Sequence, residues 1–223
     1  MEKIKEQISE MLFESAYTAK DYKFNQEVPK GPNALAMYKW ITKEIHEINE
    51  QIDDIEKKHG LHVICKKGCS ACCSQGIVVS MGEVLPMEIY ILNLSNEEKN
   101  KLRERVVQQC EQLEQNGIKK DSIEKCFGEQ AQRRVQESYF SLQMPCVFLD
   151  CEGCCSIHEI RPTACWKYRE YGSENNCEIS CFSDTGVDFT DWESREFNRI
   201  LSAKPSGKKL MLLPFAIREL MRW

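Results

Sequence analysis

The chain has 223 residues, of which 42% are hydrophobic, and this content is enough to build the core of a folded domain. Its 30 Lys and Arg residues stand against 35 Asp and Glu residues, and the net charge of -5 has the wrong sign for a protein that depends on nucleic-acid phosphates. The longest apolar stretch, 210–217, is short and contains Pro214, so we expect no membrane span.

Cysteine is the outlier of the composition, with 13 residues. Residues 1–20 interleave charged and apolar side chains without the continuous apolar stretch of a secretory signal, so we expect a cytoplasmic protein. In a reducing compartment, an excess of cysteine indicates metal binding or redox chemistry rather than disulfides. The odd total also fits poorly with complete pairing.

The first strong pattern in chain order is an aliphatic seam. Isoleucines at 41, 45, 48, 52 and 55 alternate spacings of four and three, which predicts a helix over 34–59 that ends near Gly60. We therefore expect residues 1–60 to form an N-terminal helical segment. A short seam packs on its own domain or pairs with a second copy, so a homodimer is the alternative.

Two capping boxes follow the first cysteine-rich stretch. Each has a serine followed three residues later by glutamate, a pattern typical of a helix start. We predict an extended run over 76–80, a helix from Ser80 through Leu92, a helix from Ser95 to Asn116-Gly117, and weakly helical character over 122–143.

The second cysteine-rich stretch, 146–181, has no clear periodicity, which predicts a loop-rich region. Thr190 caps a predicted helix through about Ala203, the KPSG at 204–207 breaks it, and 209–222 is predicted as a last apolar helix. The expected fold class is mainly α: a helical scaffold with two irregular cysteine-rich metal-binding loops. We expect a single domain over 1–223, with a cysteine-cluster core at 62–181 and C-terminal helices at 188–223.

Eleven cysteines fall into two clusters. A gap of two residues between cysteines lets a tight turn bring both sulfurs to one ion, as in zinc and iron–sulfur sites. Gly68 and Gly153 each precede a cysteine, and we predict left-handed turns at both. The first cluster is Cys65-Lys-Lys-Gly-Cys69-Ser-Ala-Cys72-Cys73, and the second is Cys146-Val-Phe-Leu-Asp-Cys151-Glu-Gly-Cys154-Cys155, followed by Cys165, Cys177 and Cys181.

The segment Arg161-Pro162-Thr-Ala-Cys165 predicts a short helical turn with proline at its first position, which would aim Cys165 toward the second cluster. Arg161 then either donates to a sulfur of the site or pairs at the surface with Glu159 or Glu170.

Other candidate ligands are weaker. Cys110 and Cys126 stand alone in helical stretches, and we predict both to be small core residues. His62 and His158 lie three residues from the clusters, close enough to ligate, but we expect partly exposed polar side chains there.

The motifs CKKGCSACC, PCVFLD, CSIHEIRP and TAC, spread over roughly 62–181, resemble the YkgJ-type cysteine-cluster family, a zinc- or iron-chelating domain. The cysteine region of flagellin lysine methylases, which are much longer proteins, is also similar. Relative to the family pattern, Cys151, Cys154 and Cys181 are additions, and Cys181 competes with Cys177 for the eighth position. The resemblance implies as metal ligands Cys65, Cys69, Cys72, Cys73, Cys146, Cys155, Cys165 and Cys177.

We therefore expect a metal-binding protein with zinc or an iron–sulfur cluster at one or two sites. Adjacent side chains diverge in extended backbone, so Cys72 and Cys73 should serve different metals or opposite sides of one larger cluster, and the same holds for Cys154 and Cys155. One alternative is an iron–sulfur redox protein or an iron–sulfur enzyme, with methyl transfer as an analogy. Another is a metal-stapled helical adaptor that binds a partner through its isoleucine seam or C-terminal helix. Neither a catalytic residue nor a protein partner is assigned.

Overall fold

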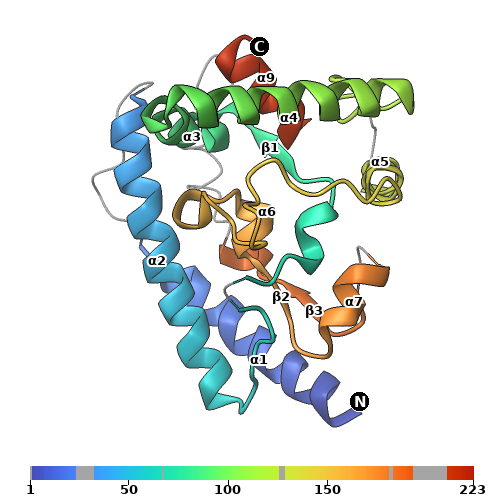
Figure 1. The fold of residues 1–223 in the computed structure, drawn as a ribbon. Helices are drawn as coiled ribbons and strands as arrows, with labels where there is room; N and C mark the ends of the chain where they lie inside the picture. The colour runs from blue at the N-terminus through green and yellow to red at the C-terminus, as the bar shows by residue number, and fades with distance from the viewer. Residues whose placement is uncertain (1, 24–32, 67, 126–128, 181–182, 193–209) are drawn as a thin grey trace.

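The computed structural model describes residues 2–23, 33–66, 68–125, 129–180, 183–192 and 210–223. The described chain is mainly helical, which confirms the predicted fold class (Figure 1). The helices are α1 (Glu2–Asp21), α2 (Ala34–Lys58), α3 (Met81–Asn93), α4 (Asn96–Gln115), α5 (Glu129–Phe140), α6 (Thr163–Trp166), α7 (Glu174–Ile179) and α9 (Leu213–Met221). The strands are β1 (Val78–Ser80), β2 (Tyr168–Glu170), β3 (Gly186–Asp188) and β4 (Leu210–Leu212), and the 3-10 turns are η1 (Ala71–Ser74), η2 (His158–Ile160) and η3 (Thr190–Trp192).

Helix α2 forms where the isoleucine seam predicts it. The Asn33 side chain caps its first turn by accepting a hydrogen bond from the Ala36 amide, and Gly60 follows its C-terminus with a φ of 64°. All five seam isoleucines are buried in the chain's own core. Because α2 packs against α1 and α3, the seam is not available to a second copy of the chain.

Both capping boxes form as predicted. At the start of α3, the Ser80 hydroxyl accepts from the Glu83 amide while a Glu83 carboxylate oxygen accepts from the Ser80 amide at 2.8 Å. Ser95 and Glu98 make the same reciprocal pair at the start of α4. Local side-chain chemistry therefore determines where these two helices begin.

The prediction of a single helix over 209–222 is wrong at its start. Residues Leu210–Leu212 form β4, which pairs antiparallel with β1, and α9 begins only at Leu213. The extended run before α3 carries unpaired backbone groups, and β4 satisfies them. Pro214 lacks an amide hydrogen and fits only in the first turn of a helix, so α9 begins immediately before it.

The second cysteine-rich stretch has more regular structure than the predicted loop region. Strand β2 pairs antiparallel with β3, and α7 lies between them in the chain. The side chain of Ser173 caps α7 by accepting from the Asn175 amide. The sequence does not reveal these elements because each is only a few residues long and no tight-turn signal joins the two strands.

Two other predictions meet the structure in part. The weakly helical stretch 122–143 contains α5, which begins at Glu129. The chain forms a 3-10 turn at Thr190–Trp192 where a capped helix is predicted to begin. The remainder of that helix, through Ala203, and the break at 204–207 lie outside the described residues.

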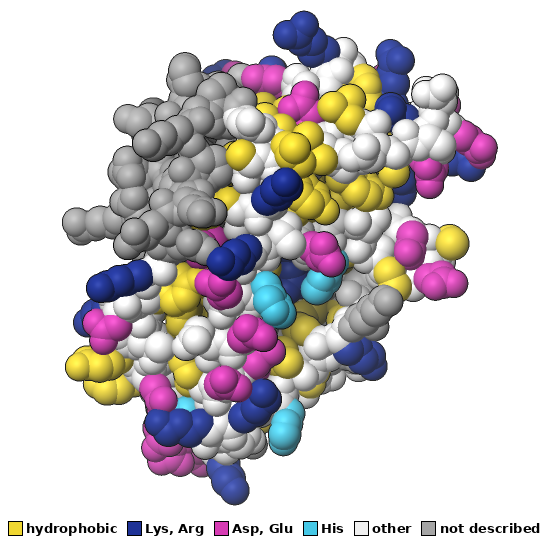
Figure 2. Space-filling view, turned by 90° about the vertical axis from the view of Figure 1, so that its left-hand side faces the viewer, with side chains coloured by type: hydrophobic (Ala, Val, Ile, Leu, Met, Phe, Trp, Pro, Cys, Tyr) yellow, Lys and Arg dark blue, Asp and Glu magenta, His cyan; other side chains and the backbone are white. Residues whose placement is uncertain are grey.

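The helices surround the cysteine-rich loops (Figure 1). Helix α2 runs along one side with α1 crossing its lower part, and α3, α4 and α9 pack together at the other end of the molecule. On the α2 side, basic and acidic side chains are interspersed over the surface (Figure 2). In the described residues, no helix combines the length and the apolar character that crossing a bilayer requires.

Because Ile52 is completely buried on α2, replacing it with alanine removes packed methyl groups and leaves a cavity. We expect Ile52→Ala to lower the free energy of unfolding by about 2–5 kcal/mol, as measured by urea denaturation. Gln51→Ala changes an exposed side chain on the same helix turn and should stay within about 0.5 kcal/mol of the parent. Equal changes in the free energy of unfolding for the two substitutions would contradict the burial of the isoleucine seam in the core.

Candidate metal centre

The first cysteine loop is held by tight backbone turns. The Cys69 amide donates to the Lys66 carbonyl, and the Cys73 amide donates to the Ser70 carbonyl at 2.8 Å. Residues 71–74 form the 3-10 turn η1, so Cys72 and Cys73 do not lie in extended backbone as the sequence argument assumed. With three residues per turn, successive backbone positions point about 120° apart, but the Cys73 thiol lies close enough to hydrogen-bond to Cys72, so the expected divergence of this pair is not observed.

The second loop begins as a small hairpin. Leu149 and Cys155 form an isolated β-bridge, and the Ser156 amide donates to the Phe148 carbonyl at 2.9 Å. Phe148 itself is buried in the core. The hairpin therefore carries Cys155 on a stem that is fixed by hydrophobic packing, with its tip at residues 150–154.

The two loops touch at their predicted left-handed glycines. Gly68 has a φ of 84° and Gly153 a φ of 76°, which confirms both predictions. A Cβ atom on Gly153 would lie 3.4 Å from the Ser70 hydroxyl and 3.6 Å from the Gly68 carbonyl oxygen. A Cβ on Gly68 would lie 3.9 Å from the Cys154 sulfur. The backbones of the two loops therefore approach each other closely at Gly68 and Gly153.

Short element α6 aims Cys165 toward the same space. It begins at Thr163, with Pro162 at the N-cap rather than at the predicted first helical position. The proline ring fixes the φ angle of Pro162 at the start of the turn. The Cys165 amide then closes the turn by donating to the Pro162 carbonyl at 2.8 Å.

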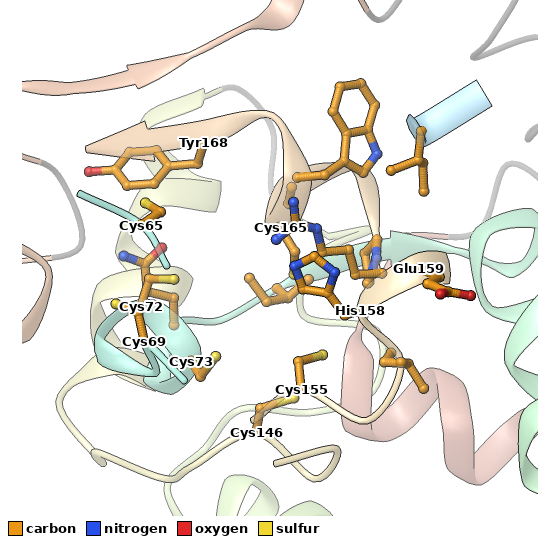
Figure 3. Close-up of a pocket in the computed structure, with 18 of the residues that line it drawn as sticks. Cys65, Cys69, Cys72, Cys73, Cys146, Cys155, His158, Glu159, Cys165 and Tyr168 are labelled. Carbon is orange, nitrogen blue, oxygen red and sulfur yellow. The ribbon is translucent and has the colours of Figure 1, made fainter. Parts of the chain in front are cut away.

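Eight cysteines from the two loops and α6 line one cavity of about 800 Å³. Figure 3 shows Cys65, Cys69 and Cys72 near one another beside Tyr168, Cys146 next to Cys155 farther along, and Cys73 between the two groups. The lining cysteines are Cys65, Cys69, Cys72, Cys73, Cys146, Cys154, Cys155 and Cys165.

The remaining predicted cysteines lie elsewhere. Cys177 is 5% exposed on α7, which packs against η1 of the first loop. Cys151 is exposed at the hairpin tip, and Cys181 lies outside the described residues, so its competition with Cys177 is not resolved. Cys110 is buried in the core, as predicted, while Cys126 is among the residues that the structure does not describe.

Across the described part of the chain, no three His, Cys, Asp or Glu side chains already have the geometry to hold a metal ion together. The donor chemistry nevertheless fits a soft metal, because eight of the twelve Cys, His, Asp and Glu side chains at the cavity wall are thiols. The fold therefore gathers the sulfurs in one space, and their assignment to individual ions is a separate step.

Burial raises the pKa of several of these thiols. It raises the pKa of Cys146 to about 12 and that of Cys165 well above its usual range. Cys72 is the exception, since hydrogen bonding from the Cys73 thiol lowers its pKa to about 7. Cys73 is shifted upward by the same interaction and by burial.

Arg161 lines the cavity, and its Nε atom is buried without a hydrogen-bond partner. Within the described ranges, no carboxylate pairs with its guanidinium, so the alternative of a surface pair with Glu159 or Glu170 is not realised. Burial lowers the pKa of Arg161, while the nearby thiols Cys165 and Cys155 act in the opposite direction. Its cationic group therefore faces the cysteine cluster.

His158 and His62 are both exposed, and of the two His158 lines the cavity. Burial, followed by the charge of Arg161, lowers the pKa of His158 and favours the neutral imidazole. This leaves His158 as a polar wall residue rather than a second positive charge.

A buried ion cluster fixes β2, and with it the first loop, to α2. Arg169 donates to Glu56 at 2.8 Å and to Asn49 at 2.8 Å, and it also pairs with Asp53. The Tyr171 hydroxyl donates to the other Glu56 oxygen. This cluster could not be predicted from the sequence, because Arg169 lies more than 110 residues from Glu56 and Asn49 and no local pattern connects them.

The first loop is connected to this cluster through the backbone. The Ile64 amide, directly before Cys65, donates to the Glu170 carbonyl at 2.9 Å. On the other face of β2, the Glu170 carboxylate accepts from the Gly172 amide at 2.7 Å and from the Asn176 side chain on α7. Strand β2 therefore positions both Cys65 and the helix that carries Cys177.

Comparison with known families adds one match. A family model named CxxCxxCC, with the description "Putative zinc- or iron-chelating domain", matches residues 64–195 and so covers both cysteine clusters. Searches of the curated proteins and of the solved structures find no match to the chain.

Removing Arg169 would leave Glu56 as a buried carboxylate without its cation. We expect Arg169→Ala to lower the free energy of unfolding by about 3–5 kcal/mol in urea denaturation. The double variant Arg169→Met/Glu56→Gln removes both charges and should recover a large part of that loss. An equal or greater loss in the double variant would show that lost packing, rather than an unpaired charge, accounts for the effect.

Proposed function

The chain belongs to the CxxCxxCC family of cysteine-cluster proteins, and on this basis we propose that it holds metal at two adjacent four-cysteine sites. The observation that carries the proposal is the single cavity lined by thiols from both clusters. The first site would consist of Cys65, Cys69, Cys72 and Cys177, and the second of Cys73, Cys146, Cys155 and Cys165.

The first set is supported by position and electrostatics. Cys65, Cys69 and Cys72 lie together in Figure 3, and α7, which carries Cys177, packs against η1. Burial raises the pKa of Cys177 to about 12. Nearby charges raise this pKa further, and they come from Cys72, Glu170, Cys65 and Cys69. These cysteines are therefore close enough to act on one another.

The second set is supported in the same way. Cys146 lies next to Cys155 in Figure 3, on the two sides of the hairpin stem. Apart from burial, the pKa of Cys165 is raised by Cys146, Cys72 and Cys155. Cys73 is affected by Cys146 and Cys165 and lies between the two groups in Figure 3, so we assign it to this set, although Cys72 also acts on Cys146 and Cys165.

The ligand chemistry suits zinc or an iron–sulfur cluster, because both are bound by four thiolates. Eight thiolates around two zinc ions would carry a net charge of about -4, and the guanidinium of Arg161 would offset part of it. Zinc would supply structure, worth about 10–16 kcal/mol in small peptides, whereas iron–sulfur clusters would supply electron transfer.

The cavity volume leaves room for the iron–sulfur alternative, which is the second candidate function. About 800 Å³ is in the range of small-molecule sites and is more than two bare ions fill. Metal analysis, acid-labile sulfide and a visible spectrum of protein purified without oxygen separate the two. Zinc without sulfide or colour would support a structural or metal-handling role, and iron with matching sulfide would support redox or cluster-dependent chemistry.

Two single substitutions test the division into two sites. We expect Cys69→Ser and Cys165→Ser each to remove about half of the bound metal and to lower the melting temperature, because each takes one of four ligands from a different site. The double variant should retain almost none. Cys110→Ser, in the core of α4, is the control and should keep the full metal content.

The outcomes distinguish the models. Complete loss of metal in either single variant would indicate one shared centre and contradict two separate sites. Unchanged metal content in both variants would remove Cys69 and Cys165 from the ligand set and overturn the proposal.

Arg161 tests the charge balance of the sites. Arg161→Gln should weaken metal retention about 10–100-fold in competition with a chelator, because the thiolates lose the cation that faces them. Arg161→Lys keeps the charge and should lie between this variant and the parent. Retention equal to the parent in Arg161→Gln would exclude the role in charge compensation.

A further inference from the structure

We propose that Cys151 and Cys154 form a solvent-facing dithiol through which a divalent soft cation, such as zinc, enters the two proposed sites. This inference rests on the proposed function and goes beyond it. It assigns a transfer role to two cysteines that are additions to the family pattern and that stand outside the two proposed ligand sets.

The hairpin tip holds this pair in a fixed turn. One Asp150 carboxylate oxygen accepts from the Glu152 amide at 2.9 Å and from the Cys154 amide at 2.8 Å. The Asp150 amide donates to the Cys154 carbonyl at 3.0 Å, and the left-handed Gly153 completes the turn. Cysteines separated by two residues in such a turn have the spacing that brings two sulfurs to one ion.

Exposure changes stepwise along the tip. Cys151 is exposed, and Cys154 is partly buried and lines the cavity. The next residue, Cys155, belongs to the proposed second set. A cation bound at the tip therefore has one sulfur in solvent and the other at the wall of the cavity that seven of the eight proposed ligands line.

Cys154 also adjoins the first loop. The position of a Cβ on Gly68 would be 3.9 Å from the Cys154 sulfur, so this thiol lies against the backbone that precedes Cys69. A sulfur at this contact is adjacent to both clusters. That location suits exchange of a cation toward either proposed site.

The transfer needs no redox partner. Two tip thiols release two protons as they bind the divalent cation, and the cation keeps its charge. Sulfur–metal bonds to the tip then break as bonds to four buried thiols form, those thiols release four protons, and the tip thiols take two protons back. The net change is one cation bound and four protons released.

The experiment measures how fast the full-length, metal-free protein takes zinc from a weak chromogenic chelator under reducing, oxygen-free conditions. Cys151→Ser and Cys151→Ser/Cys154→Ser are compared with Glu152→Gln, which alters the same exposed turn and keeps both thiols. We expect the two cysteine variants to load about tenfold more slowly, with unchanged final zinc content, and Glu152→Gln to load at the parent rate.

Other results overturn the proposal in distinguishable ways. Loading of the double variant at the parent rate would exclude the entry role and leave the buried sites intact. A final zinc content lowered by about one ion would make the pair a permanent ligand set instead. If the parent protein binds no zinc and contains iron with sulfide, the zinc-entry inference fails while the proposed cysteine sites stand. If it binds neither zinc nor iron, both the inference and the proposed function are overturned.

Discussion

A guanidinium group removed from water loses several kcal/mol of hydration unless its partners replace it, and Arg169 has such partners along one face of α2. Asn49, Asp53 and Glu56 lie on successive turns of that helix, so they accept the planar group in one position. Because β2 follows α6 and pairs with β3, fixing Arg169 also fixes the elements that carry Cys165 and Cys177. A buried charge contributes little net stability, but it discriminates strongly against other arrangements of this strand on the helix.

The parts of the fold that sequence patterns predicted are those whose causes are local. The isoleucine seam and the two Ser-x-x-Glu boxes place α2, α3 and α4, because periodicity and capping act within a few residues. Strand β4 was missed because an apolar run such as 210–213 suits a helix or a strand equally, and its partner β1 lies far away in the sequence. Pro214 was the available clue, since it marks a helix start at Leu213.

In the cysteine region, too, the features with local causes were predicted and those that depend on tertiary packing were not. Gly68 and Gly153 adopt the left-handed conformation that the sequence predicted, and thiols from both predicted clusters line one cavity. Spacing did not reveal that Cys154 is in the cavity wall while Cys177 is buried behind η1, because these positions depend on how α7 and the hairpin pack. Which thiols share an ion is likewise a tertiary property, and for this reason it remains a proposal with a stoichiometric test.

The pairing of β1 with β4 also sets an order of events during synthesis. Strand β1 follows the first cysteine loop directly, yet its partner is made more than 130 residues later. At about 5–20 residues per second, on the order of ten seconds separate the two strands on the ribosome. Every cysteine of both clusters is translated before β4, so the nascent chain presents its thiols to the surrounding metal pool before the strand that completes this sheet has been made.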